Sequence, residues 1–255
     1  MEFEVLGEAI FLAGANALND PDEGMVRWRV QGSFEDAFKF ALHVLRAENG
    51  NASPDALIAN AGEIARNMVA SPSIPKEIVD RMHMILGNLV RIACFTTHPL
   101  NGPMWTHYGN FSDASGGITP HGGLCIEYTV DDAWRQIGLR PVQYVDKRPQ
   151  INMLARDSLE AQFAYATSVK SPDWAYEDEW RLVSYIDAKP PWPDNLAHNS
   201  KLRLQGAVRS VILGLNVTSL VAGKVIEVVR RRAPHVVVKQ VVRNERTAAL
   251  TLVSL

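Results

Sequence analysis

The fold is organised around Trp174-Ala-Tyr-Glu-Asp-Glu-Trp-Arg181, which leads into the strand-like run Leu182-Val-Ser-Tyr-Ile186. Aromatic and charged residues are denser here than anywhere else in the chain. If the stretch is a strand, Glu177, Glu179 and Arg181 share one face, because side chains alternate with period two. The other face then carries the intervening residues, Asp178, Trp180 and Leu182.

Two interpretations of this stretch stay open. In the first, the charges form an ion pair at the start of a strand, with aromatic packing beside it. In the second, the stretch is the wall of a functional pocket, with Glu179 or Glu177 as its working carboxylate.

Length and composition bound the class of protein. The chain has 255 residues, of which 47% are hydrophobic and 21% charged, as in a globular protein with a sizeable core. We expect a single α+β domain over residues 1–255. The formal net charge of −2 gives no global field that attracts nucleic acid or an anionic membrane. The chain contains no run of about 18 apolar residues, so we expect no membrane span.

The two cysteines, Cys94 and Cys125, lie in apolar runs. Cysteine without a partner behaves as a small buried hydrophobe, so we expect two core thiols in a reducing cytoplasm, although a disulfide between them stays open. The acidic start, Met1 to Val5, lacks the basic and apolar regions of a secretion signal. These observations predict a cytoplasmic protein.

Residues 33–88 have the pattern of three helices. Ser33-Phe-Glu-Asp36 resembles a capping box, and apolar residues then recur at helical spacing. Ser53-Pro54 opens a second helix, and Pro75 opens a third that runs to Asn88. Because the links between them are short, we predict a three-helix insertion or cap packed at the side of a sheet.

Strand patterns outnumber helix patterns after residue 89. Many neighbours are joined by short links, and the last two strands form a closing hairpin. We therefore expect an α+β fold with a mixed, mostly antiparallel sheet rather than a doubly wound one. The predicted strands are 8–13, 25–30 (an edge strand or an extended arm), 90–95, 124–128, 142–145, the central stretch to about residue 186, 208–213, 235–242 and 248–253, and the later helices are 104–108, 131–137, 152–169 and 219–231.

The usual sequence motifs of nucleotide, hydrolase and metal sites are absent. The chain contains no Gly-x-Gly-x-x-Gly, Walker loop or Gly-x-Ser-x-Gly. Its seven histidines are too scattered to predict a metal site. His107, in Trp105-Thr-His-Tyr108, is either a helix histidine bonded to a backbone carbonyl or part of a pocket wall.

Two charged stretches have more than one interpretation. Arg230-Arg-Arg232 could contact the phosphates of a nucleic acid. It could equally be a solvated helix end, where cations interact favourably with the helix dipole. Asn19-Asp-Pro-Asp-Glu23 lacks the spacing of a calcium loop, and it is either a turn with capping roles or a ligand contact through Asn19 and Asp20.

Several stretches, taken together and in order, carry a family resemblance over most of the chain. They are Ile10-Phe-Leu-Ala13, Leu18-Asn-Asp-Pro21 with Glu23, Ile92-Ala-Cys-Phe-Thr96, Met104-Trp-Thr-His-Tyr108, Gly123-Leu-Cys-Ile-Glu-Tyr128, Val142-Gln-Tyr144, Trp174 to Arg181, and Val211-Ile-Leu-Gly214. They resemble the bacterial domain-of-unknown-function family numbered 2971. The pieces Trp-x-His-Tyr and Tyr-Glu-x-Glu-Trp-Arg are the most specific, whereas the central helices and residues 215–255 match only in general pattern.

The chain departs from the pattern of that family in two places. Members begin with a strand containing tyrosine and arginine before the Asn-Asp-Pro turn. Here Met1 lies too close to the turn to supply this strand, so we expect that either the start of the sequence is truncated or the strand is absent. The loop between Tyr108 and Gly123 is longer than usual, which would alter the mouth of a pocket.

Glu177-Asp-Glu179 also resembles the Glu-x-Glu element of ADP-ribosyltransferases. In those enzymes the second Glu bonds the nicotinamide-ribose hydroxyl and stabilises an oxocarbenium-like transition state. A fixed carboxylate does so because positive charge develops on the sugar as nicotinamide leaves. The resemblance implies NAD as the ligand and implies no metal.

The same resemblance implies roles for particular residues. Glu179 would be the catalytic carboxylate, and Glu177 would orient the acceptor or Glu179. Tyr108 would stack on nicotinamide, while Arg181 or an arginine near the N-terminus would hold the pyrophosphate. The expected substrate-binding residues are Trp105, His107, Tyr108, Tyr176, Arg181, Asn19 and Asp20.

The predicted function is that of an ADP-ribosyltransferase-like bacterial protein in a defence or toxin context. The alternative is a non-enzymatic binding or regulatory protein, in which the Trp/Tyr/Glu/Arg cluster is structural. A small nucleotide or a protein is the expected partner, and a membrane is not. A third interpretation, binding of nucleic acid, requires Arg230, Arg231 and Arg232 to lie on one exposed face.

Overall fold

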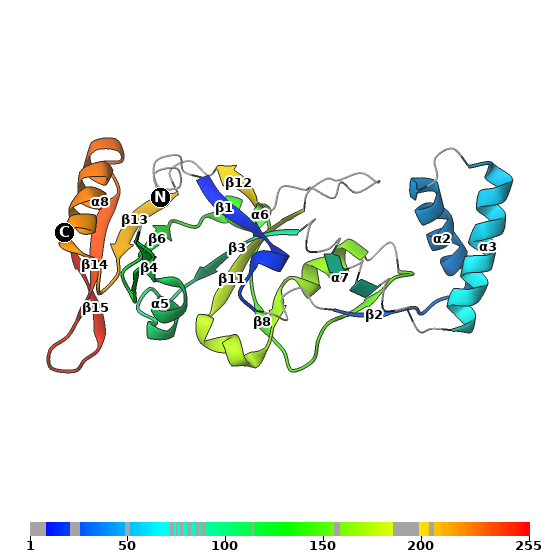
Figure 1. Cartoon of the computed structure of the whole chain (residues 1–255), viewed down its shortest axis with the longest axis horizontal. Helices are drawn as coiled ribbons and strands as arrows, with labels where there is room; N and C mark the ends of the chain where they lie inside the picture. Colours follow the sequence, from blue (N-terminus) through cyan, green and yellow to red (C-terminus); the bar gives the residue numbers. More distant parts are fainter. Residues whose placement is uncertain are drawn as a thin grey trace.

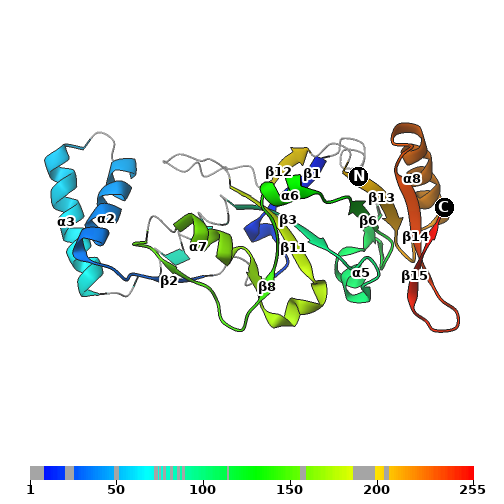
Figure 2. The same cartoon turned by 180° about the vertical axis from the view of Figure 1, so that it is seen from behind.

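A computed structural model gives the fold of residues 9–20, 26–48, 52–71, 74, 76, 79–80, 83–84, 87, 90–113, 115–155, 159–185, 199–203 and 207–255. The molecule is elongated (Figure 1). Helices α2 (Phe34–Glu48) and α3 (Pro54–Ala70) lie at one end of its long axis. Helix α8 (Ser219–Arg232) lies at the other end, and the view from behind shows the same order (Figure 2).

A five-stranded antiparallel sheet occupies the middle of the molecule. Its central strands β3 and β11 pair over seven residue positions, from Glu179↔Thr96 to Tyr185↔Val90. One face buries Leu182 and Trp134, and the other buries Ile92 and Val183. In spatial order the strands are β12 (Asn199–Arg203), β1 (Ala9–Gly14), β3 (Val90–Thr96), β11 (Glu179–Tyr185) and β7 (Leu139–Pro141).

A four-stranded sheet lies beside it and packs against α8. Strands β13 and β14 are parallel and are joined through α8, whereas the other pairs are antiparallel. Thr218 caps α8, and the helix buries Val225 and Val229 against the sheet. The strands in order are β15 (Leu250–Ser254), β14 (Val237–Arg243), β13 (Val208–Leu213) and β6 (Leu124–Tyr128).

Short ribbons and helices complete the described part of the chain. Strands β2 (Arg27–Arg29) and β9 (Gln150–Asn152) are parallel, as are β8 (Gln143–Tyr144) and β10 (Val169–Lys170), while β4 (Phe111–Ser112) and β5 (Ile118–Thr119) are antiparallel. The short helices are η1 (Ala15–Ala17), α5 (Gly102–Tyr108), α6 (Asp132–Gln136), α7 (Leu159–Ala166) and η3 (Pro172–Glu177).

The predicted helical block forms a hairpin of α2 and α3 that stands beyond the β2–β9 ribbon (Figure 1). Ala37 and Ala65 pack together with Leu154, which follows β9. No residue of this cluster belongs to the five-stranded sheet. The third predicted helix, over 75–88, falls mostly on residues outside the described part of the chain.

The α+β class and the mostly antiparallel sheets are confirmed. The closing hairpin is confirmed as β14 and β15. The helix predicted over 152–169 is wrong at both ends, because Asn152 ends β9 and Val169 begins β10. Among the described residues, no helix is long and apolar enough to cross a membrane.

Candidate functional site

Strand β11 begins at Glu179, two residues later than the sequence alternation predicts. Glu177 is the last residue of η3, a turn that Pro172 opens. Asp178 then adopts a left-handed backbone conformation with a φ of 43°, which ends the turn. The predicted shared strand face is therefore confirmed for Glu179 and Arg181 and wrong for Glu177.

Arg181 holds the Glu179 carboxylate from the same face of β11. Its Nε donates to Glu179 Oε1 at 2.8 Å and its Nη2 to Oε2 at 3.1 Å, a bidentate geometry that is among the strongest of charged contacts. Its Nη1 donates to the carbonyl of Thr167 at 3.0 Å. Because Arg181 is 0% exposed, the geometry gives no support to its predicted role in holding a pyrophosphate.

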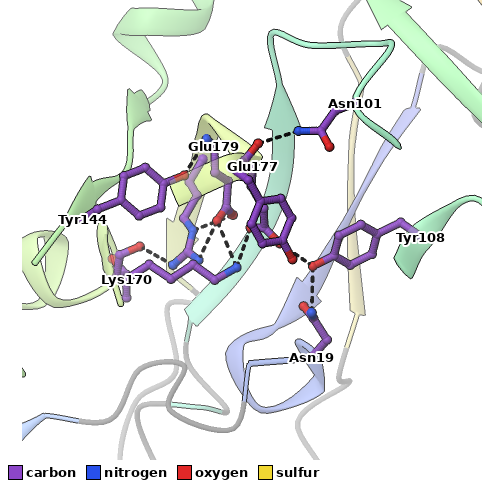
Figure 3. A network of polar contacts seen from close by, with 10 residues as sticks. Asn19, Asn101, Tyr108, Tyr144, Lys170, Glu177 and Glu179 are labelled. Atoms are coloured by element: carbon purple, nitrogen blue, oxygen red, sulfur yellow. Dashed lines mark hydrogen bonds and ion pairs between the residues drawn. The ribbon is translucent and has the colours of Figure 1, made fainter. Parts of the chain in front are cut away.

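Lys170 joins the two glutamates that the sequence analysis singled out (Figure 3). Its Nζ lies 2.6 Å from Glu177 Oε2 and 3.4 Å from Glu179 Oε2. The same ammonium group lies 4.4 Å from the ring centroid of Trp174, which is a cation–π distance. Glu177 thus reaches the same set of charges as Glu179 although it is not on the strand.

We call Lys170, Glu177, Glu179 and Arg181 the central cluster. Their side chains are between 0 and 4% exposed, and two carboxylates are matched by two cations. Buried ion pairs of this kind are costly to desolvate, but removal of one partner leaves an uncompensated buried charge and typically costs about 3–5 kcal/mol. The ion pair predicted at the start of the strand is present between Glu179 and Arg181, with Lys170 as an additional member, and the pocket-wall interpretation stays a prediction.

The environment of the cluster shifts several pKa values. Burial alone would raise the pKa of Glu179, but Arg181 and Lys170 outweigh it and hold that pKa below its ordinary value. Burial would lower the pKa of Lys170, yet the two carboxylates raise it overall. Burial, and then the hydrogen bond to Glu177, raise the pKa of Tyr108 far above its ordinary range. Tyr108 is therefore a hydrogen-bond donor to a carboxylate.

Tyr108 connects the buried charges to the surface (Figure 3). Its hydroxyl donates to Glu177 Oε1 at 2.7 Å and accepts from Asn19 Nδ2 at 2.7 Å, while the residue is 46% exposed. Around it lies what we call the aromatic group: His107, Tyr108, Trp174 and Tyr176. The ring centroids of its neighbouring members are 6.1 to 6.4 Å apart.

Helix α5 is anchored at both ends of this arrangement. Asn101 caps it by accepting from Met104 N–H, and its side-chain amide donates to the carbonyl of Tyr176 at 2.5 Å. Trp105 is buried at 5% exposure against the four-stranded sheet, and its indole N–H donates to the Pro99 carbonyl. Trp105 is therefore an anchor for the helix, and its predicted contact with a ligand stays a prediction.

The sheet face that carries Glu179 and Arg181 reaches solvent next to them. Cys94 lies opposite Arg181 in the β3–β11 pair and is exposed, and its thiol bonds Glu179. Phe11, on the same face of β1, is 41% exposed. The prediction of two core thiols is thus wrong for Cys94, while Cys125 is partly buried and neither forms a disulfide.

The remaining predicted contacts have mixed outcomes. His107 is exposed and belongs to the aromatic group. Asn19 contacts Tyr108, whereas Asp20 is 7% exposed; the rest of its turn, residues 21–25, lies outside the described part. The loop expected between Tyr108 and Gly123 contains the β4–β5 hairpin.

Two residues that hold Glu177 and Glu179 in place were not predicted from the sequence. Tyr144 accepts the backbone N–H of Glu179 through its hydroxyl at 2.9 Å, and Lys170 lies between the carboxylates. Both sit on the parallel β8–β10 ribbon, where Lys170 pairs with Tyr144. Tyr144 belongs to a stretch that carried the family resemblance. A lone lysine seven residues before Glu177, however, gives no local signal of a buried ion pair.

The basic run at the end of α8 is exposed. Arg231 lies 3.8 Å from Glu227 one turn earlier. Consecutive helical residues point in directions about 100° apart, so Arg230, Arg231 and Arg232 fan around the helix end. Nucleic-acid binding through this run stays a prediction.

Within the described residues, no group of three or more His, Cys, Asp or Glu side chains is arranged to hold a metal ion. A scan against protein-family models, a search of curated proteins and a search of solved structures each found no match to the chain. The resemblances to family 2971 and to the Glu-x-Glu element stay predictions that rest on the residues quoted for them.

Proposed function

We propose that the protein binds a nucleotide of the NAD type at the aromatic group and transfers the ADP-ribosyl part to an acceptor. One observation carries the proposal: an unbroken set of contacts runs from Glu179 through Lys170 and Glu177 to the half-exposed ring of Tyr108. Two carboxylates thus lie beside rings that reach solvent. This juxtaposition is what a site for a planar base and a ribose requires.

The aromatic group supplies the binding surface in this proposal. Planar bases stack on aromatic side chains with about 1–3 kcal/mol per base, and Tyr108, Trp174 and Tyr176 offer such faces. Asn19 and the hydroxyl of Tyr108 supply polar groups for the ribose or the amide of the base. Arg181 takes no part in contact with the ligand.

The reaction breaks the bond between C1′ of the ribose and the ring nitrogen of nicotinamide. The bonding pair leaves with the nitrogen, which makes nicotinamide neutral and leaves positive charge on the sugar. An O–H or N–H group of the acceptor attacks C1′ and loses its proton to solvent. A carboxylate beside C1′ stabilises the charge that develops.

Of the two carboxylates, Glu177 is the better placed for that role. It already accepts a hydrogen bond from a half-exposed hydroxyl, whereas both oxygens of Glu179 face Arg181 or Lys170. We therefore assign Glu177 to the sugar and Glu179 to orientation of Lys170 and Arg181. This assignment reverses the roles that the Glu-x-Glu resemblance implied.

The second candidate function is binding or regulation without catalysis. It is favoured by the charge balance of the central cluster, in which two cations match two carboxylates. Such a cluster has no net negative charge left to stabilise a sugar cation, and in this candidate Lys170 holds Glu177 in a structural ion pair. The second candidate predicts nucleotide binding, or protein binding, with no release of nicotinamide.

Nicotinamide release decides between the two candidates. Purified protein is incubated with NAD and a cell extract that contains nucleic acid and protein acceptors, and nicotinamide is quantified by chromatography. The proposal expects release by the native protein and at least a tenfold loss in Glu177→Gln and Glu179→Gln. Glu127→Gln, outside the site, is the control and should retain release. No release by any folded variant would favour the binding function.

A further inference from the structure

Lys170 contacts both glutamates of the central cluster and one ring of the aromatic group. Its ammonium group meets Glu177, Glu179 and the ring of Trp174 at 2.6, 3.4 and 4.4 Å. An ammonium group has three N–H donors, and two carboxylates and an aromatic face are suitable partners for them. One side chain therefore relates both carboxylates to the aromatic group.

Backbone hydrogen bonds on both sides of Lys170 fix the strand from which its side chain extends. Strand β10 pairs in parallel with β8, and Val145 N–H donates to the Lys170 carbonyl at 2.9 Å. On the preceding turn, Gln143 N–H donates to the Ser168 carbonyl at 2.8 Å. The Lys170 side chain is only 4% exposed, and its ammonium group is already engaged by Glu177, Glu179 and Trp174, so it acts on a ligand through these residues.

We propose that Lys170 is the positioning residue of the site, which fixes the Glu177 carboxylate and, through it, the hydroxyl of Tyr108 toward the ligand. The inference rests on the proposed function for its ligand, but not for its geometry. Glu177 Oε2 is held by Lys170 and Oε1 by Tyr108. Rotation of the carboxylate would break both contacts.

Lys170 also balances the negative charge of the two glutamates. The groups that face it are Glu177, Glu179, Arg181 and the phenols of Tyr144 and Tyr176. Tyr108 adds a hydrogen bond to Glu177, and Cys94 adds one to Glu179. Without the ammonium group, two neighbouring carboxylates would share one cation, and like charges so placed resist joint ionisation.

The experiment that tests this proposal removes the positive charge of Lys170 and keeps the length of its side chain. In Lys170→Met we expect at least a tenfold weaker binding of NAD at pH 8. We also expect one carboxyl group to titrate above its ordinary range, visible in the pH dependence of ¹³C carboxyl resonances of labelled glutamate. Lys224→Met, at an exposed position of α8, should change neither result. The carboxyl titration is read without ligand, so its outcome is independent of whether NAD binds.

Two further variants separate positioning from mere packing. Lys170→Arg retains the positive charge and should show no new carboxyl titration. The double variant Lys170→Met with Glu177→Gln restores the charge balance, so it should fold even where the single variant does not. In this double variant too, we expect no carboxyl group to titrate above its ordinary range. The proposal is overturned if folded Lys170→Met titrates like the native protein. It is also overturned if the double variant keeps the new titration, or if the arginine and methionine variants behave alike.

Discussion

Two glutamate–lysine clusters in the described part of the chain have ion pairs of nearly equal distance and very different surroundings. In the central cluster, Lys170 and Glu177 are 2.6 Å apart with side chains 4% and 3% exposed. On the four-stranded sheet, Lys239 and Glu127 are 2.7 Å apart with side chains 22% and 30% exposed. We call Glu127, Lys239, Ser210 and Arg209 the lateral cluster.

The comparison teaches that burial, more than distance, sets the importance of an ion pair. Solvent screens the lateral cluster and can replace either partner, so its contribution is small. The central cluster has no such substitute, since its charges have left water and depend on each other. Only the central cluster, moreover, is bonded to a half-exposed tyrosine.

The largest expected effect is that of Lys170→Met. Loss of the ammonium group leaves two buried carboxylates with Arg181 alone, and we expect the free energy of unfolding to fall by about 3–5 kcal/mol. Lys239→Met should cost about 1 kcal/mol or less. Chemical denaturation of both variants measures the difference. Equal losses would show that burial does not separate the two clusters.

Tyr144→Phe should cause the next largest loss in the free energy of unfolding. It removes the acceptor of the Glu179 backbone N–H, and an unsatisfied donor of this kind costs about 1–3 kcal/mol. Tyr165→Phe, on an exposed tyrosine of α7, is the control and should leave the unfolding midpoint in urea unchanged. A Tyr144 variant as stable as the native protein would exclude a supporting role for that hydroxyl.

The two clusters should also differ in how steeply their contribution to the free energy of unfolding depends on pH. The folded-state pKa of Glu179 lies below its ordinary value of 4.5, so its stabilising contribution is present above that value and is lost as the pH falls through the lowered pKa. Each proton taken up changes the stability by about 1.4 kcal/mol per pH unit. Stability of Glu179→Gln should therefore depend less steeply on pH below about 4.5.

Glu127→Gln provides the comparison for that experiment. Burial opposes the shift, but Lys239 and Ser210 also lower the pKa of Glu127, so the sign of the effect is the same. Because the Glu127 side chain is 30% exposed, we expect a smaller change in slope than for Glu179→Gln. A larger change would contradict the ranking of the two clusters.

The smallest expected effect is that of Arg209→Ala in the lateral cluster. The Arg209 side chain is 67% exposed and its Nε lies 3.6 Å from Glu127. Exposed pairs contribute about 0.2–1 kcal/mol, and we expect the lower end of that range. Thermal unfolding at low and high salt is the measurement. A loss of stability as large as that of Lys170→Met would contradict the ranking of the two clusters.

The alternation of Glu179, Trp180 and Arg181 made the strand and its two faces predictable from sequence. The turn before it was not, because one left-handed residue, Asp178, displaces Glu177 from the strand. Even so, Glu177 joins the cluster, through a lysine on a different ribbon. Contacts of this kind depend on tertiary pairing, which no local pattern encodes.

Exposure was the other property that sequence could not supply. Cys94 sits in an apolar run, and such runs are usually buried. Here the face of β3 beside Arg181 is uncovered at that position, so the thiol is exposed. The burial of Trp105 could not be predicted either: this tryptophan lies inside an aromatic motif and is a buried anchor of α5.

The central claim is that the aromatic group above the central cluster binds a nucleotide, and titration calorimetry with NAD tests it most directly. Tyr108→Ala and Tyr165→Ala form a matched pair, since the two residues are 46% and 45% exposed but only Tyr108 bonds Glu177. The account predicts saturable binding that is at least tenfold weaker in Tyr108→Ala and unchanged in Tyr165→Ala. Absence of binding to the native protein, or equal effects of the two substitutions, would contradict it.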